Sequence, residues 1–298
     1  MRHSHFSRFV FLCCILAASL YGISARAASV VVGGKNFTEQ QLMVEITARY
    51  LEAKGFTVTK KDGMGSALLR QAQIDGQIDL YWEYTGTSLI TYNKIKGRLS
   101  PEATYEKVKE LDAAKGLVWL NPSKANNTYA FAMNKDKAQK LGIATMSDLA
   151  RVINGGKDLT FACNSEFYVR PDGLHPLEKD YGFHFSQGDV KRMDTGLTYQ
   201  ALKDRQVDLA LVFATDGRIP AFNFVVLKDD KNYFPSYAMT PVIRKATLDA
   251  NPTLGPLLNA LSAKLDVSTM ANLNANVDVQ KKSFSDVAET FLKSSGLI

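Results

Sequence analysis

The sequence predicts an α/β protein of two doubly wound lobes joined by a hinge that the chain crosses twice. Apolar strand segments alternate with amphipathic helical segments along most of the 298-residue chain, as in parallel α/β sheets. The alternation restarts in the second half, where segment 206–217 (QVDLALVFATDG) repeats segment 77–87 (QIDLYWEYTGT). A late strand at 237–245 is followed only by helical sequence, which indicates that the chain returns to the first lobe.

The first 27 residues have the pattern of a cleaved secretory signal peptide. A basic start is followed by an apolar run and by the small-residue motif Ala25-Arg26-Ala27. The apolar run is shorter than the ~20 residues that a membrane-spanning helix needs. We therefore expect cleavage after Ala27 and a periplasmic protein.

Charge and cysteine content limit the function classes. The leader carries three arginines and no acidic residue, so the formal charge of +6 falls to +3 in the mature chain. That excess is too small to indicate nucleic-acid binding. Cys163 is the remaining cysteine, so the mature chain contains no internal disulfide, and its apolar neighbours favour a buried thiol.

The first half of the mature chain has the strand–helix–strand–helix–strand order of a parallel sheet. A helix is predicted to start at Thr38 with a capping box to Gln41 and to end at Gly55. The other expected elements are strands at 29–34, 56–61 and 78–84 and a helix at 65–76. Ligands bind such sheets beyond the carboxyl ends of the strands.

The second half repeats this order after a helix at 101–115 and a strand at 128–133. Expected elements are helices at 137–142 and 145–153, a strand at 158–164, a loop at 166–173, helices at 176–182 and 198–204, a strand at 207–213 and helices within 247–297. We place the crossings near 127–133 and 236–240. Residues 28–128 and 238–298 then form lobe I, and residues 129–237 form lobe II.

The internal repeat indicates where the two halves meet a ligand. With a constant offset of 129 residues, Tyr84 aligns with Phe213 and Asp79 with Asp208. Each half therefore places an aromatic residue at the end of an equivalent strand. Two such ends facing each other form a cleft that can clamp a small molecule.

Six short segments together resemble the substrate-binding proteins of ABC transporters for glycine betaine, choline, carnitine and related quaternary amines. They are KNFTEQ, YWEYTGT, NNTYA, EFYVRPDG, TDGRI and FPSYAMTPVI, spread over the mature chain. The resemblance implies the type II periplasmic-binding-protein fold, in which two lobes close on a ligand held by aromatic rings. Carried over, the cage consists of Tyr84, Tyr129, Phe213 and Tyr237. Family members commonly have tyrosine where Phe213 stands.

Physical chemistry supports an aromatic cage for this ligand class. A trimethylammonium group donates no conventional hydrogen bond, so ring faces recognise it, at ~0.5–2 kcal/mol each. Four rings supply ~2–8 kcal/mol, whereas micromolar binding requires about 8 kcal/mol. Polar contacts must therefore add to the cage.

We expect the anion and polar side of the site to be formed by Lys35, Thr87, Arg170 and Asn127. Arg170 can fork onto a carboxylate, and Lys35 precedes a helix N-terminus that favours negative charge. Thr87 offers a hydroxyl, and Asn127 stands where some relatives have an acidic residue. Asp216 and Arg218 of TDGRI are expected mainly to pair with each other.

The expected partners are a small quaternary amine and a membrane ABC permease, with a monomeric protein and no nucleic acid. One alternative is a binding protein of the same fold for another zwitterion, such as an amino acid or a sulfur-containing betaine. It would require a carboxylate for a primary ammonium, from Glu39, Glu83 or Glu166. An enzyme is not expected, because no nucleophile motif, phosphate loop or metal-spaced cluster occurs, and no cofactor is predicted.

Overall fold

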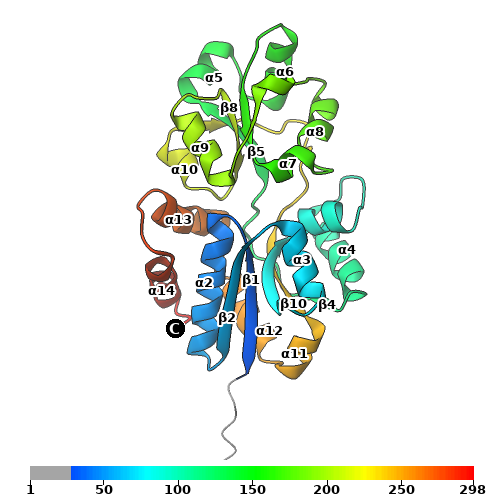
Figure 1. The fold of residues 1–298 in the computed structure, drawn as a ribbon, viewed down its shortest axis with the longest axis vertical. Coiled ribbons are helices and arrows are strands. Elements are labelled where there is room, and N and C mark those ends of the chain that lie inside the picture. Colours follow the sequence, from blue (N-terminus) through cyan, green and yellow to red (C-terminus); the bar gives the residue numbers. More distant parts are fainter. Residues whose placement is uncertain (1–27) are drawn as a thin grey trace, which may run out of the picture.

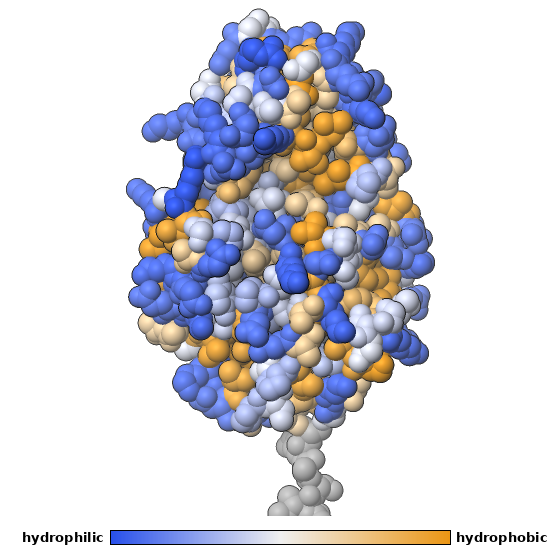
Figure 2. Space-filling model, turned by 180° about the vertical axis from the view of Figure 1, so that it is seen from behind, coloured by the Kyte–Doolittle hydropathy of each residue, from blue (hydrophilic) through white to orange (hydrophobic). Residues whose placement is uncertain are grey.

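A computed structural model describes residues 28–298 and shows two bodies, each built on a five-stranded sheet flanked by helices (Figure 1). The predicted signal peptide, residues 1–27, lies outside the described residues. We call the half built on the sheet β2-β1-β3-β10-β4 lobe I and the half built on the sheet β7-β6-β8-β5-β9 lobe II. Seen from behind, the two lobes form one continuous surface (Figure 2).

Lobe I contains both ends of the described chain. Its elements are β1 Ser29–Lys35, α2 Thr38–Ala53, β2 Thr57–Met64, α3 Ser66–Ile74, β3 Leu80–Tyr84, the π-helix η2 Thr87–Tyr92, α4 Pro101–Ala113, β4 Leu117–Trp119, β10 Met239–Arg244, α11 Lys245–Ala250, α12 Leu254–Ser262, α13 Val267–Asp278 and α14 Phe284–Ser294. Helices α13 and α14 pack against α2. None of the helices in residues 28–298 combines the length and apolar character needed to cross a bilayer.

Lobe II is a continuous part of the chain. Its elements are β5 Tyr129–Asn134, α5 Lys135–Leu141, α6 Met146–Asn154, β6 Phe161–Cys163, α7 Ser165–Val169, α8 Leu174–Tyr181, the 3-10 helix η3 Gln187–Asp189, β7 Val190–Arg192, α9 Thr195–Lys203, β8 Leu209–Phe213, α10 Arg218–Ala221 and β9 Phe224–Val226. Stacked Phe131 and Phe161, with ring centroids 4.3 Å apart, lie in its core.

The two sheets share one topology. In lobe I, β1 is parallel to β2 and β3, whereas β10 is antiparallel to β3 and β4. In lobe II, β6 is parallel to β7 and β8, whereas β5 is antiparallel to β8 and β9. The sheets are therefore mixed, because β5 and β10 each enter their sheet from the other lobe and run opposite to its central strands.

The sequence repeat corresponds to a structural repeat. The Asp79 carboxylate accepts a hydrogen bond from the Val31 backbone N–H at 2.8 Å, and the Asp208 carboxylate accepts one from the Thr160 N–H at 2.9 Å. Each aspartate thus ties the start of its strand to the neighbouring parallel strand. The same contact in both lobes brings β3 and β8 to the cleft in equivalent positions.

The chain passes between the lobes in segments 120–128 and 227–238, which lead into β5 and β10 (Figure 1). The two passages are hydrogen-bonded to each other. The Asn127 N–H donates to the Tyr237 carbonyl at 3.1 Å, and the Tyr237 N–H donates to Asn126 Oδ1 at 2.7 Å. The residue bounds given above for the two lobes remain a prediction.

Two local predictions were wrong. Helix α2 has Phe37 at its N-cap and no side-chain cap, because the Thr38 hydroxyl donates to Asp278 Oδ1 of α13 at 2.8 Å instead. Segment 166–173 begins within helix α7, which Asn164 caps by accepting the Phe167 N–H at 2.7 Å. Local capping by Asn164 outweighs the loop signal of the proline and glycine that follow.

Candidate functional site

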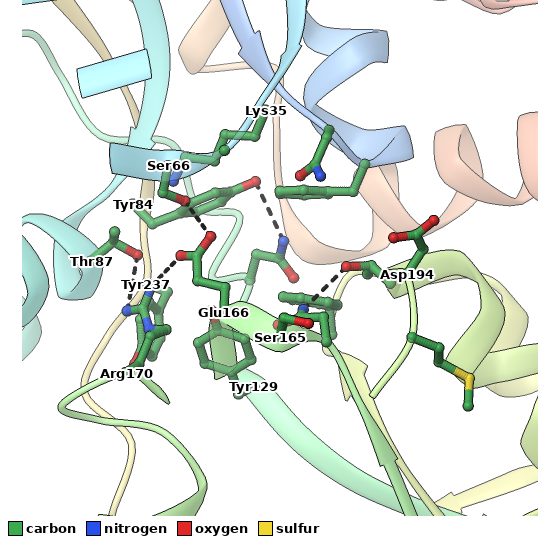
Figure 3. A pocket seen from close by; sticks show the side chains of 18 residues that line it. Lys35, Ser66, Tyr84, Thr87, Tyr129, Ser165, Glu166, Arg170, Asp194 and Tyr237 are labelled. Atoms are coloured by element: carbon green, nitrogen blue, oxygen red, sulfur yellow. Dashed lines mark hydrogen bonds and ion pairs between the residues drawn. The ribbon is translucent and has the colours of Figure 1, made fainter. Parts of the chain in front are cut away.

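A cavity of about 240 Å³ lies between the lobes, at the carboxyl ends of β1, β3, β6 and β8 (Figure 3). All eight residues that the sequence predicted for the site line it. They are Lys35, Tyr84, Thr87, Asn127, Tyr129, Arg170, Phe213 and Tyr237. Their roles toward a ligand remain predictions.

The four predicted cage rings come from the strands that meet at the cleft. Tyr84 ends β3 and Phe213 ends β8, whereas Tyr129 begins β5 and Tyr237 lies two residues before β10. The Tyr129 centroid is 5.1 Å from that of Phe213 and 5.3 Å from that of Tyr237, which it meets edge-on. The repeat thus places one ring from each sheet at the cavity, and the crossings add two more.

Phe37 is a fifth ring that the sequence reasoning missed. Its ring stacks on Phe213 at 5.6 Å between centroids, with an interplanar angle of 8°, and on Tyr84 at 6.3 Å and 23°. Phe37 lies two residues after β1, at a carboxyl end of the lobe I sheet. That position, within the KNFTEQ segment, was the available signal.

The hydroxyl of Tyr84 is occupied by protein groups, so its ring is the part that faces the cavity. It donates to Glu39 Oε1 at 2.6 Å and accepts from Gln40 Nε2 at 3.0 Å. Burial and the nearby Glu39 raise the pKa of Tyr84 well above its usual value. A neutral ring with a fixed hydroxyl suits contact with a cation that donates no hydrogen bonds.

Arg170 is engaged by protein carboxylates. Its Nε and Nη2 fork onto Asp172 at 2.7 and 2.8 Å, its Nη1 lies 2.9 Å from Glu166 Oε1, and its Nη2 is 3.5 Å from Thr87 Oγ1 across the cleft. Its guanidinium lies 5.3 Å from the Tyr129 ring centroid. The fork that was expected to hold a ligand carboxylate therefore holds Asp172, which leaves Nη1 as the nitrogen shared with Glu166.

Lys35 is also paired within the protein. Its Nζ lies 2.6 Å from Glu83 Oε1 and 4.9 Å from the Tyr84 ring centroid. Glu83 is fully buried and also accepts from the Tyr81 hydroxyl at 2.9 Å and the Tyr92 hydroxyl at 3.1 Å. Lys35 therefore neutralises a buried carboxylate at the wall of the cavity.

Glu166 lines the cavity between the two lobes. Its Oε2 accepts from the Ser66 hydroxyl of α3 at 3.0 Å, while Oε1 faces Arg170 (Figure 3). Burial favours the protonated acid, but Lys35, Arg170 and the Ser66 hydrogen bond together lower the pKa of Glu166. The group is a carboxylate at neutral pH.

Glu39 connects the lobes behind the cage. Its Oε1 accepts from Tyr84 and from Asn127 Nδ2 at 2.8 Å, and its Oε2 accepts from the Thr215 hydroxyl of lobe II and from Asn274 of α13. Burial raises the pKa of Glu39, and these hydrogen bonds offset only part of that rise. Asn127 thus serves Glu39 in this structure.

Other predictions concern groups around the site. Arg218 and Asp216 form the expected pair, at 2.9 Å for Nε and 2.6 Å for Nη2, and Arg218 Nη2 reaches Asp278 of lobe I at 3.2 Å. Cys163 is buried, which raises its pKa to about 12 and keeps the thiol protonated. Residues 28–298 contain no group of three or more His, Cys, Asp or Glu side chains placed to hold a metal ion.

Comparison with known proteins identifies the family of this chain. Residues 28–294 match the family described as the substrate binding domain of the ABC-type glycine betaine transport system. A glycine-betaine-binding protein of Pseudomonas aeruginosa is 46% identical over 292 residues, which cover 96% of this chain and 94% of that protein. A third comparison is with the ergothioneine transport permease/ergothioneine binding protein EgtU of Helicobacter pylori. The identity is 35% over 294 residues, which cover 97% of this chain but only 52% of EgtU.

Solved structures give the same result. A crystal structure described as a glycine betaine/carnitine/choline ABC transporter superposes with a TM-score of 0.74 at 31% identity, covering 91% of this chain and 99% of that one. The family match spans both lobes and therefore every residue of the cavity described above. The chain belongs to the family of substrate-binding domains of ABC-type glycine betaine transport systems.

Proposed function

We propose that this protein captures a quaternary-ammonium compound, such as glycine betaine, choline or carnitine, between its lobes and delivers it to an ABC permease. One observation carries the proposal: rings from both lobes, Tyr84, Tyr129, Phe213 and Tyr237, together with Phe37, surround one cavity. Ring faces attract a cation that cannot donate hydrogen bonds. The volume of about 240 Å³ is below the roughly 300–1,000 Å³ of sites for drug-sized ligands, which suits a small solute.

The proposed mechanism is closure of the lobes on the ligand. Contacts across the cleft support it: Thr215 with Glu39, Glu166 with Ser66, and Arg218 with Asp278. Rotation about the two crossings breaks these contacts without disturbing either sheet. Ligand binding shifts the population toward the closed form because only that form brings all five rings around the ammonium.

The proposal includes the setting of the protein. It acts as an exported, periplasmic monomer that binds without catalysis and hands its ligand to a membrane permease. The name of EgtU, which includes both a permease and a binding protein, supports the pairing with a permease. Lys35, Thr87, Arg170 and Asn127 form the polar wall of the cavity and fix the ligand's orientation.

A second candidate is another zwitterion, including a sulfur-containing betaine or an amino acid. The similarity to EgtU favours the former. A primary ammonium would need a carboxylate within the cavity. Glu166 lines the cavity with a side chain 38% exposed, whereas Glu39 and Glu83 are buried, at 4% and 0% exposed.

The test is calorimetric titration of the protein with a trimethylated amine and its dimethyl and primary-amine analogues. The proposal expects affinity to fall as methyl groups are removed, because each ammonium N–H gained prefers water to a ring face. Phe213→Leu should weaken the trimethylated ligand by ~0.5–2 kcal/mol.

The matched control is Phe222→Leu, since Phe222 packs edge-on against Phe224, outside the cavity. It should leave the affinity unchanged. If the primary amine binds as well as the trimethylated compound, the cage proposal fails and the second candidate replaces it.

A further inference from the structure

The charges around the cavity are not balanced. Lys35 is paired with Glu83, whose side chain is 0% exposed, and Arg170 is forked onto Asp172, whose side chain is 4% exposed. These two cations and two carboxylates neutralise each other. Glu166 is a third carboxylate beside them, and its only cationic hydrogen-bond partner within residues 28–298 is the same Arg170.

Glu166 differs from the other two carboxylates in its access to the cavity. Its side chain is 38% exposed and lines the cavity, whereas Glu83 and Asp172 lie behind the wall. Helix α7 of lobe II carries Glu166 to the cleft, and the Ser66 hydroxyl of lobe I holds its Oε2 (Figure 3). Its charge therefore faces any ligand that enters.

The position of Glu166 is also one that a ligand carboxylate would take. Because the Arg170 fork faces Asp172, Nη1 remains as the guanidinium nitrogen toward Glu166, at 2.9 Å. Nη1 and the Ser66 hydroxyl are two donors aimed at one carboxylate. In this structure, that carboxylate belongs to the protein.

We propose that Glu166 is a specificity-determining residue. Its carboxylate fills the anion position at Arg170 Nη1 and Ser66 Oγ. It thereby shifts the selectivity of the site toward cationic ligands and away from zwitterions that carry a carboxylate. The inference rests on the function proposed above and refines its ligand class. Choline is the cationic representative, and glycine betaine is the zwitterionic one.

The physical reason is the different interaction of one fixed charge with the two ligands. A cationic ligand in the cage gains attraction from Glu166, since two unit charges in a partly buried site interact at a low effective dielectric constant. A zwitterion gains the same attraction at its ammonium but must bring its own carboxylate beside Glu166, or displace Glu166 from Arg170 and Ser66. Like charges that share one site repel each other strongly.

The test is Glu166→Gln in the mature protein, titrated calorimetrically with choline and with glycine betaine. Glutamine keeps the size and an acceptor oxygen but loses the charge. We expect the Kd for choline to rise about tenfold, which corresponds to 1.4 kcal/mol, and the Kd for glycine betaine to stay constant or fall. The ratio of the two dissociation constants therefore changes in favour of glycine betaine.

One variant separates this role from general effects. Glu110→Gln makes the same substitution at an exposed carboxylate of α4, which pairs with Lys107 and lies outside the cavity. It should leave the ratio close to that of the wild type.

The outcomes are distinct. The inference is wrong if Glu166→Gln changes both affinities by the same factor, or if Glu110→Gln reproduces its effect on the ratio. If the wild type binds none of choline, glycine betaine and carnitine, the proposed function itself fails, and this inference falls with it. Thermal unfolding of each ligand-free variant checks that the substitutions leave the fold intact.

Discussion

Gly217 of lobe II packs directly against Ala275 of α13 in lobe I. A Cβ atom at Gly217 would lie 2.4 Å from Ala275 Cβ and 2.5 Å from the Ala271 carbonyl oxygen. The backbone of Gly217 is in the right-handed helical region, with φ −69° and ψ −14°, so conformation does not demand glycine there. The requirement is the close approach of α13, which exists only while the lobes are together.

Gly217→Ala should therefore weaken ligand binding, with little effect on the stability of either lobe. Overpacking of this kind costs ~1–3 kcal/mol, and here the cost falls on the closed form. We expect the ligand Kd to rise about tenfold, with little change in the unfolding temperature of the ligand-free protein. Calorimetric titration and thermal unfolding measure the two effects.

Gly188→Ala is the matched control, because a Cβ at Gly188 has no atom within 4 Å. It should bind as the wild type does. Wild-type affinity in Gly217→Ala would show that the contact between Gly217 and α13 does not limit closure.

Phe37→Leu should weaken a trimethylated ligand by ~0.5–2 kcal/mol, since leucine keeps apolar area but lacks the negative ring face. Loss of the stacks with Phe213 and Tyr84 also removes an aromatic link across the cleft. Phe56→Leu, at the opposite end of α2, is the control with a partly buried ring in the same lobe. Calorimetric titration measures the affinities. If the wild type, Phe37→Leu and Phe56→Leu bind equally tightly, Phe37 is not part of the cage.

Glu39 predicts a specific pH dependence of stability. Its pKa is raised in the folded protein above the value of 4.5 expected in the unfolded chain, so the folded state binds the proton more tightly. The ionised group therefore lowers the free energy of unfolding at neutral pH, and this cost is relieved as pH falls through the folded pKa toward 4.5. Glu39→Gln removes the titration.

The measurement is urea unfolding of wild type and Glu39→Gln at pH 7, 6 and 5. The free energy of unfolding of the wild type, minus that of the variant, should increase as pH falls. Glu289→Gln serves as the control. Glu289 is a surface carboxylate, and its hydrogen bond with Lys293 lowers its pKa instead of raising it. A wild-type minus Glu39→Gln difference that is constant or decreases toward pH 5 contradicts the assignment.

The sequence predicted the parts of the site that repeat or that follow strands. Tyr84 and Phe213 could be placed because equivalent strands end at equivalent points, a consequence of strand alternation and of the Asp79 and Asp208 anchors. The pair Asp216–Arg218 was predictable because its members are two residues apart. Arg170 and Asp172 have the same spacing and also pair, which the sequence reasoning did not predict, while the ligand contact of Arg170 stays a prediction.

Other features depend on contacts that local sequence does not encode. Glu166 meets Ser66 across 100 residues, and Thr38 meets Asp278 across 240. The second contact removes the hydroxyl that local patterning assigned to a capping box. Phe37 was missed because an apolar residue just before a helix is also common where no ligand binds.

The direct hydrogen bonds between the two crossings have a consequence for the order of events during capture. Rotation displaces atoms in proportion to their distance from the axis, and Tyr129 and Tyr237 lie where the bonded segments enter β5 and β10. If the lobes rotate as proposed, these two rings stay together whether the cleft is wide or narrow, while Tyr84, Phe37 and Phe213 travel with their lobes. We therefore expect an arriving ammonium to meet a preformed corner first, after which the remaining rings move toward a ligand that is already seated.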